Sequence, residues 1–140
     1  MAIEIAENLA VERLAKGLVG VLETYSGIDE VFEPDAFFDI NVPAWRFQME
    51  GPQTFIGWLQ EYCPDGYRIA AKSPIPTATG FVLEVEGDYA DPEGNPLFFR
   101  NLYVCKVQDG RITELTFWCT GDWDVETREH HRAEVQLSRP

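Results

Sequence analysis

Two hydrogen-bonding side chains, Asn101 and Tyr103, stand two residues apart in an apolar stretch that predicts a strand over 97–107. Successive strand side chains point to opposite faces, so both lie on one face with Phe99 and Cys105. A lysine on the other face of this strand must reach solvent. We therefore expect the face that carries Asn101 to point inward. A buried Asn or Tyr can donate a hydrogen bond to a developing enolate oxygen. The alternative is a core pair satisfied by backbone groups.

Four carboxylates are candidates for moving a proton beside these donors: Asp39, Glu84, Glu86 and Asp122. A carboxylate in a dry pocket has a raised pKa, which suits proton transfer. Each candidate also has a structural alternative. Asp39 would pair with Arg46 or face solvent, and Asp122 would end a strand in water. For the two glutamates we favour a cross-strand charge ladder with an arginine of the neighbouring strand.

The last predicted strand, 111–123, supplies a second wall. Its inward face would carry large apolar side chains, which suit a hydrophobic, aromatic or polycyclic ligand. The members of that face are Leu115, Phe117, Cys119, Gly121 and Trp123. Asp122 would fall on the opposite, outward face. A packed core accounts for the same pattern without any ligand.

The other reactive side chains predict little chemistry. Cys63, Cys105 and Cys119 are widely spaced, which argues against a disulfide framework or a zinc site and favours free thiols. His130 and His131 lie in the tail, where they are solvated unless the tail folds over the pocket mouth. Nucleophile-elbow, phosphate-loop and HExxH motifs are absent from the sequence. We therefore expect no metal and no cofactor.

Charge and length narrow the class of protein. The 140 residues fit one domain, expected over 1–125, with a polar tail over 126–140. A net charge of −13, with scattered basic residues, argues against nucleic acid and anionic membrane surfaces as partners. The sequence has neither a membrane-spanning apolar run nor a basic leader, so a cytoplasmic location is expected.

Periodicity predicts helices followed by a sheet. Apolar residues at three- and four-residue steps indicate a first helix over 3–25, on a stripe of Ile5, Leu9, Leu14, Leu18, Val21, Leu22 and Tyr25. A short helix, two short strands and a helix opened by Gly51-Pro52 follow. Period-two alternation then predicts long strands over 81–89, 97–107 and 111–123. This order is typical of an α+β domain, with helices packed on a curved antiparallel sheet around one pocket.

Three stretches in this order resemble the nuclear transport factor 2-like (NTF2-like) superfamily, which includes ketosteroid isomerase, scytalone dehydratase and SnoaL-type polyketide cyclases. They are Val31 to Phe38, Gly51 followed by Phe55, Ile56 and Leu59, and Asp109 to Glu114. Pro43-Ala44-Trp45-Arg46 and Thr120-Gly121-Asp122-Trp123 are most similar to the SnoaL-like group. The resemblance implies a cone-shaped fold with a small-molecule pocket.

The resemblance also implies roles for single residues. Tyr103 falls where ketosteroid isomerase carries its oxyanion-binding acid, and Asn101 falls near a polar pocket residue of scytalone dehydratase. At the position of the isomerase's base it places Ile40 inward, not Asp39. Trp45 joins the apolar residues expected to bind substrate.

The predicted function is a cofactor-free acid/base isomerase, dehydratase or cyclase acting on a hydrophobic carbonyl compound. Secondary metabolism is the setting that the SnoaL likeness implies. The alternative is a non-catalytic domain that binds a hydrophobic ligand or dimerises. A homodimer through the sheet is common in the superfamily, and an apolar outer face would support it. That face would carry Phe98, Leu102, Val104 and Trp118.

Overall fold

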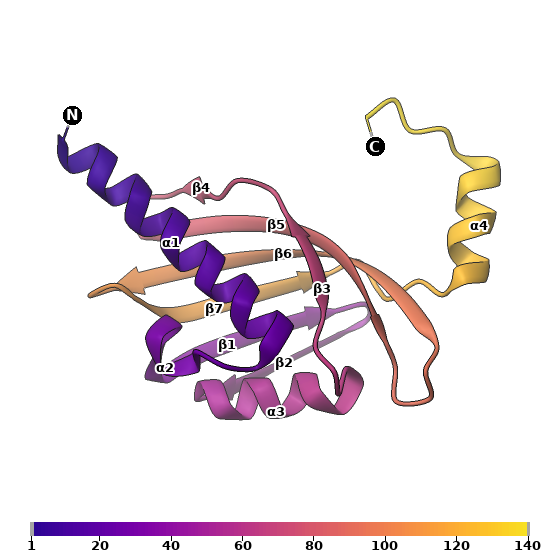
Figure 1. Cartoon of the computed structure of the whole chain (residues 1–140), viewed down its shortest axis with the longest axis horizontal. Helices are drawn as coiled ribbons and strands as arrows, with labels where there is room; N and C mark the ends of the chain where they lie inside the picture. Colours follow the sequence, from indigo (N-terminus) through magenta and orange to yellow (C-terminus); the bar gives the residue numbers. More distant parts are fainter. Residues whose placement is uncertain (1, 140) are drawn as a thin grey trace.

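The computed structural model describes residues 2–139, so Met1 and Pro140, the outer ends of the expected domain and tail, lie outside the described residues. Helices precede and follow a run of strands (Figure 1). The elements are α1 (Ala2–Thr24), α2 (Ile28–Val31), β1 (Phe32–Val42), β2 (Trp45–Glu50), α3 (Pro52–Tyr62), β3 (Arg68–Ala71), β4 (Ile75–Pro76), β5 (Gly80–Ala90), β6 (Pro96–Gln108), β7 (Arg111–Cys119) and α4 (Val125–Glu134). The α+β prediction is confirmed.

The strands form one sheet in the order β2-β1-β7-β6-β5-β3, with β4 pairing on β5. Neighbouring strands are antiparallel except β1 and β7, which are parallel. The predicted hairpin at Asp109-Gly110 joins β6 to β7. Both of its residues have positive φ, 53° and 79°, as a tight two-residue hairpin turn requires. The sheet is thus mixed, with one long-range parallel pair.

The helices cover one face of the sheet, which is the concave face. α1 crosses it, and α3 lies along the β1–β2 end (Figure 1). Phe55 of α3 stacks on Phe38 of β1 with ring centroids 4.4 Å apart, and Phe32 packs against both rings. Each fully buried phenylalanine contributes roughly 1.5–3 kcal/mol. This aromatic cluster fixes α3 on the sheet.

The first helix packs through only part of its length. Leu18 and Leu22 are fully buried against the sheet, as the apolar stripe predicts. Ile5 and Leu9 are on the same predicted stripe, yet they are 58% and 61% exposed. The apolar stripe therefore packs on the sheet only along the later part of the helix. The first turns of α1 project beyond the sheet, at the left in Figure 1.

The last helix stands apart from the other three (Figure 1). It begins at Asp124, whose carboxylate accepts a hydrogen bond from the Thr127 amide at 2.7 Å. Such a side-chain cap stabilises a helix by about 1 kcal/mol. None of the residues of α4 is buried. Among residues 2–139, no helix is long and apolar enough to cross a membrane.

Candidate functional site

The concave face of β6 carries the predicted row of Phe99, Asn101, Tyr103 and Cys105, and all four side chains are buried. The Asn101 amide Nδ2 donates to the Tyr103 hydroxyl oxygen at 3.4 Å. Its Oδ1 is buried without a hydrogen-bond partner among the described residues. A buried acceptor left unsatisfied costs roughly 1–3 kcal/mol, which is unusual in a plain core. The amide therefore has an unused capacity to bind something.

The facing row on β7 is apolar with one thiol. Tyr103 pairs with Phe117 across the strands, with ring centroids 5.3 Å apart, and Asn101 pairs with Cys119. Burial raises the pKa of the Cys119 thiol to about 11, and the Gly121 amide donates to its sulfur at 3.3 Å. A thiol with this pKa stays protonated at neutral pH, so Cys119 contributes packing and not a thiolate nucleophile.

The end of β7 differs from the predicted strand in one respect that changes the site. β7 stops at Cys119, and Gly121 adopts a φ of 104°. Trp123 then pairs with Phe98, exchanging both backbone hydrogen bonds. Asn101 pairs with Cys119, and Phe98 pairs with Trp123. Between these two pairs β6 advances by three residues, whereas the segment that follows β7 advances by four. The extra residue is a β-bulge, which reverses the facing beyond it.

The bulge exchanges the positions expected for Trp123 and Asp122. Directly paired residues share a face, so Trp123 lies with Phe98 on the outer face and not on the concave wall. Asp122 turns the other way, toward the buried ring of Tyr89 on the concave face of β5. From the sequence we expect Trp123 to face inward and Asp122 outward. This prediction is wrong because a period-two pattern cannot reveal an inserted residue.

Asp122 has the most unusual environment of the four candidate carboxylates. The Tyr89 hydroxyl donates to its Oδ2 at 2.7 Å. Partial burial raises the pKa of the Asp122 carboxyl, and the hydrogen bond from Tyr89 opposes this only in part. By surface area the residue as a whole is nevertheless exposed to solvent. A carboxyl with a raised pKa at the rim of a dry site can both take up and release a proton.

Aromatic rings pack around this rim. Tyr67 lies edge-on to Tyr89 and Phe99, with centroids 5.0 and 5.4 Å away. Burial raises the pKa of Tyr67 and Tyr89 far above the ordinary value, so both hydroxyls remain protonated. Trp58 of α3 meets Phe117 edge-on at 6.1 Å. Sequence reasoning missed Tyr67 and Trp58 as site neighbours, although Tyr89 is in the inward register of the 81–89 pattern.

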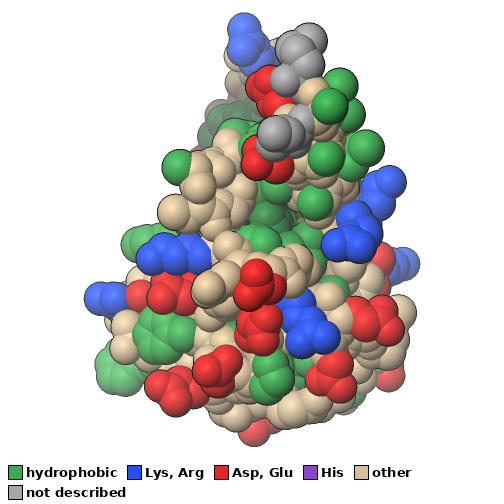
Figure 2. Space-filling model, turned by 90° about the vertical axis from the view of Figure 1, so that its left-hand side faces the viewer, with side chains coloured by type: hydrophobic (Ala, Val, Ile, Leu, Met, Phe, Trp, Pro, Cys, Tyr) green, Lys and Arg blue, Asp and Glu red, His purple; other side chains and the backbone are tan. Residues whose placement is uncertain are grey.

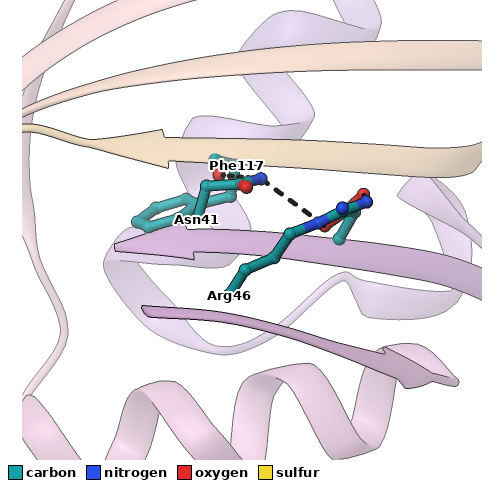
Figure 3. A network of polar contacts seen from close by, with 4 residues as sticks. Asn41, Arg46 and Phe117 are labelled. Carbon is teal, nitrogen blue, oxygen red and sulfur yellow. Dashed lines mark hydrogen bonds and ion pairs between the residues drawn. The ribbon is translucent and has the colours of Figure 1, made fainter. Parts of the chain in front are cut away.

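Asp39 lies on the outer face of β1, since Ile40 is fully buried beside it. Arg46 holds its carboxylate with two hydrogen bonds of 2.9 and 2.6 Å, and Asn41 also reaches it at 3.5 Å (Figure 3). The Arg46 hydrogen bonds lower the pKa of Asp39 below its ordinary value. Asn41 in addition donates to the Phe117 carbonyl at 3.2 Å. This pairing is the alternative that the sequence suggested for Asp39.

The two glutamates of β5 also lie on the outer face. Glu84 pairs with Lys72 and, at 3.9 Å, with Arg100, and Glu86 is 4.0 Å from the same guanidinium. The Lys72 hydrogen bond is the main reason why the pKa of Glu84 is lowered. The contacts of a cross-strand charge ladder are therefore present. Neither glutamate is directed toward Asn101.

Trp45 and the two histidines of the tail lie away from the buried donors. Trp45 is on the concave side of β2 but 71% exposed at the hairpin end, beyond the cover of α3. In the tail, His131 packs on Trp123 with centroids 5.0 Å apart, and His130 is 3.0 Å from Glu134. Neither histidine reaches the concave face. Residues 2–139 contain no cluster of three or more potential metal-binding side chains.

Two hollows of the described surface lie at its edges, and Phe99 is the one residue of the concave rows of β6 and β7 that lines either. One, of about 1340 Å³, separates α4 and the tail from the outer end of the sheet. The other is small and lined by acidic side chains near the β6–β7 turn. Asn101, Tyr103 and Asp122 line neither of them. The rings of Tyr67 and Phe99 pack against each other on the side where Asp122 lies.

No family model and no curated protein matches the chain. Solved structures do match. An NTF2-like protein from Anabaena variabilis superposes with a TM-score of 0.68 at 16% identity, over 83% of this chain and 92% of that one. An LEH-like epoxide hydrolase from M. tuberculosis has a TM-score of 0.63 at 15% identity, covering 87% and 88% of the two chains. A candidate ketosteroid isomerase from Kribbella flavida has 0.59 at 16% identity, covering 94% and 91%.

At such identities the likeness establishes a shared fold. The superposition with the NTF2-like protein covers most of both chains, and in this chain the superposed architecture is helices on a curved mixed sheet. The chain therefore has the NTF2-like fold, as the motifs in its sequence predict. Because this fold serves many reactions, function has to be argued from the site itself.

Proposed function

We propose that the concave face is a small-molecule site for cofactor-free proton transfer on a hydrophobic carbonyl compound. The class is that of an isomerase, dehydratase or cyclase, and the likeness to a candidate SnoaL-like polyketide cyclase from Jannaschia suggests secondary metabolism as its setting. A cytoplasmic location, expected from the sequence, is part of the proposal. The observation that supports the proposal most is the environment of Asp122. Its raised pKa and its hydrogen bond from Tyr89 favour proton exchange.

In the proposed reaction, the Asp122 carboxylate removes a proton from the carbon next to the substrate carbonyl. The electron pair of that C–H bond moves to the carbonyl oxygen and forms an enolate. Tyr103 would donate a hydrogen bond to this oxygen, since none of the described residues accepts one from its hydroxyl. Protonated Asp122 then returns the proton to carbon, or to a leaving hydroxyl in a dehydration.

Asn101 would help to hold the substrate. Its Nδ2 can contact the enolate oxygen, and its unpartnered Oδ1 can accept a hydrogen bond from a substrate hydroxyl. Phe99, Cys105, Leu115, Phe117 and Cys119 would supply the apolar walls. Entry then requires Tyr67 to move aside, because its ring packs against Tyr89 and Phe99 at this rim.

The test uses 2-tetralone, a bicyclic ketone with exchangeable protons beside its carbonyl. NMR would follow deuterium uptake from D₂O in the presence of the protein. Wild type should accelerate uptake, Asp122→Asn should abolish the acceleration, and Tyr103→Phe should reduce it about 10²- to 10³-fold. Asp39→Asn is the matched control, because Asp39 pairs with Arg46 on the outer face. Equal rates in wild type and Asp122→Asn, with the fold intact, would reject the proposal.

A second candidate is a binding or dimerisation domain without catalysis. The outer face of the sheet carries Trp118, Val104 and Leu102 side by side, and the first two are 52% and 37% exposed. A homodimer through this face would cover them. Sedimentation of wild type and Trp118→Glu tests it: the candidate requires a dimer that the substitution dissociates. Tetralone binding without proton exchange would favour the binding role.

A further inference from the structure

The hollow beside α4, termed here the α4 groove, is basic although the protein is strongly acidic. Six of the eleven basic side chains line it: Arg68, Lys72, Arg100, Arg128, Arg132 and Arg139. Only three acidic side chains do so, Glu86, Asp88 and Glu134. The groove lining thus carries +3, whereas the whole chain carries −13. Such an asymmetry favours an acidic occupant.

Part of this positive charge is unneutralised within the chain. Arg68 pairs with Asp88, and Lys72 and Arg100 pair with glutamates of β5. Within residues 2–139, Arg128 and Arg132 have no carboxylate at ion-pair distance. Arg128 instead stacks on Phe98, with its guanidinium carbon 4.0 Å from the ring centroid. The two guanidinium groups of α4 therefore remain available to an external carboxylate.

The groove also offers apolar surface. Phe98 and Trp123 lie on the sheet side, and Val135 and Leu137 of the tail are 45% and 54% exposed. Because no residue of α4 is buried, the helix gains little by packing on its own sheet. An occupant that combines acidic and apolar side chains would match both properties of the groove.

The chain itself contains a segment of this kind, the projecting start of α1. Residues 2–12 carry three glutamates and no lysine or arginine. Ile5 and Leu9 are one helical turn apart, on one side of the helix, and both are exposed. Figure 2 shows hydrophobic side chains beside acidic ones along this projecting end. The segment is acidic, and among its described side chains Ile5 and Leu9 do not pack on the core of their own chain, whereas Val11 does.

Length and position agree with docking onto a second copy. The eleven residues of this segment, 2–12, extend about 16 Å, and the ten residues of α4 about 15 Å. The start of α1 and α4 lie at opposite ends of the long axis of the molecule (Figure 1). A chain cannot fill its own groove, but two copies related by a two-fold axis can fill each other's.

We infer that the start of α1 of one copy docks in the α4 groove of a second copy. Ile5 and Leu9 then meet the apolar lining, and Glu4 and Glu7 meet Arg128 and Arg132. This contact shares only Phe99 with the proposed site and includes none of Asn101, Tyr103 and Asp122, so it does not depend on the proposed chemistry. It is also separate from the outer face around Trp118.

A charge-swap experiment tests the pairing. The double variants Arg128→Glu/Arg132→Glu and Glu4→Lys/Glu7→Lys change only exposed side chains, and circular dichroism would verify their folds. In sedimentation velocity at low salt, each variant alone should lose at least tenfold in self-association, because like charges then face each other. An equimolar mixture should regain association, since both grooves of the mixed pair again meet an opposite charge.

Controls separate this contact from other interfaces. Lys106→Glu/Arg111→Glu makes the same change in net charge as the groove variant, but at the β6–β7 end, and should leave self-association unchanged. A monomer at all concentrations would overturn the inference. A dimer that survives both charge reversals, or is lost only with Trp118→Glu, would overturn it too. So would sensitivity to the groove variant without sensitivity to the helix variant.

Discussion

The hydroxyl of Tyr89 and the carboxylate of Asp122 meet at 2.7 Å, although 33 residues separate them along the chain. The contact exists because Tyr89 keeps the inward register of β5 while the bulge at Gly121 turns Asp122 toward it. A carboxylate predicted to face outward thereby gains a hydrogen bond from a buried tyrosine of the concave face. Its protonation is the property that the proposed function uses.

Removing the Tyr89 hydroxyl should raise the pKa of Asp122 further. The hydroxyl donates to the carboxylate form, so its loss in Tyr89→Phe leaves burial unopposed. A carbon-13 NMR titration of the aspartate carboxyls would measure the change. Asp39, held by Arg46, is the internal control and should keep its lowered pKa. An unchanged or lower pKa of Asp122 would contradict the prediction.

Asp122→Asn should alter how stability depends on pH. The raised pKa means that the folded chain holds this proton more tightly than the unfolded chain does. The resulting stabilisation is complete below the ordinary value of 3.8 and is lost as the pH rises through the raised pKa. Relative to wild type, the uncharged Asp122→Asn variant should therefore gain stability as the pH rises from about 3 to 7, by the linkage of protonation and folding. Urea unfolding at several pH values would measure this difference, and a constant difference would count against it.

Gly121→Ala should destabilise the protein by about 1–3 kcal/mol, because a φ of 104° is strained for any residue with a Cβ. The new Cβ would also stand 3.3 Å from Pro43. Gly57→Ala is the matched control: it lies in α3 with no atom within 4 Å of the added carbon, and should gain about 0.5–1 kcal/mol. Denaturant unfolding would compare them. Equal effects would mean that the bulge does not need glycine.

The thiols should react in a defined order as the pH rises. The pKa of Cys119 is raised to about 11, and burial raises that of Cys105 further. Since the thiolate is the reactive form, both should alkylate slowly at pH 7.5, and Cys119 should react before Cys105 on approach to pH 11. Mass spectrometry after iodoacetamide treatment would identify the modified residues. Fast modification of Cys105 at neutral pH would show that the core opens there.

The sequence predicts the inner row of β6 well. Alternation alone places Asn101 and Tyr103 inward, because Lys106 and Arg100 on the other face must reach solvent. The same argument fails after Cys119, where one inserted residue reverses the facing of Asp122 and Trp123. Gly121 is the only local signal of that insertion, and a glycine in a strand has several meanings.

Other errors have different physical causes. Ile5 and Leu9 continue the apolar stripe of α1, but a stripe does not reveal whether its partner belongs to the same chain. Trp45 has the expected facing but lies beyond the cover of α3, and strand periodicity carries no information on how far a helix extends. The ring of Tyr67 packs onto Tyr89 through tertiary contacts alone.

The parallel pairing of β1 with β7 has a consequence for synthesis in the cell. Phe38 pairs with Leu115, so the inner edge of β1 has no partner until the last strand leaves the ribosome. At about 5–20 residues per second, this interval lasts several seconds. The nascent β1–β2 hairpin meanwhile presents an apolar, unpaired edge, which is a typical substrate for chaperones and a route to aggregation. Variants that slow the closure of β7 should therefore lower soluble yield more than they lower equilibrium stability.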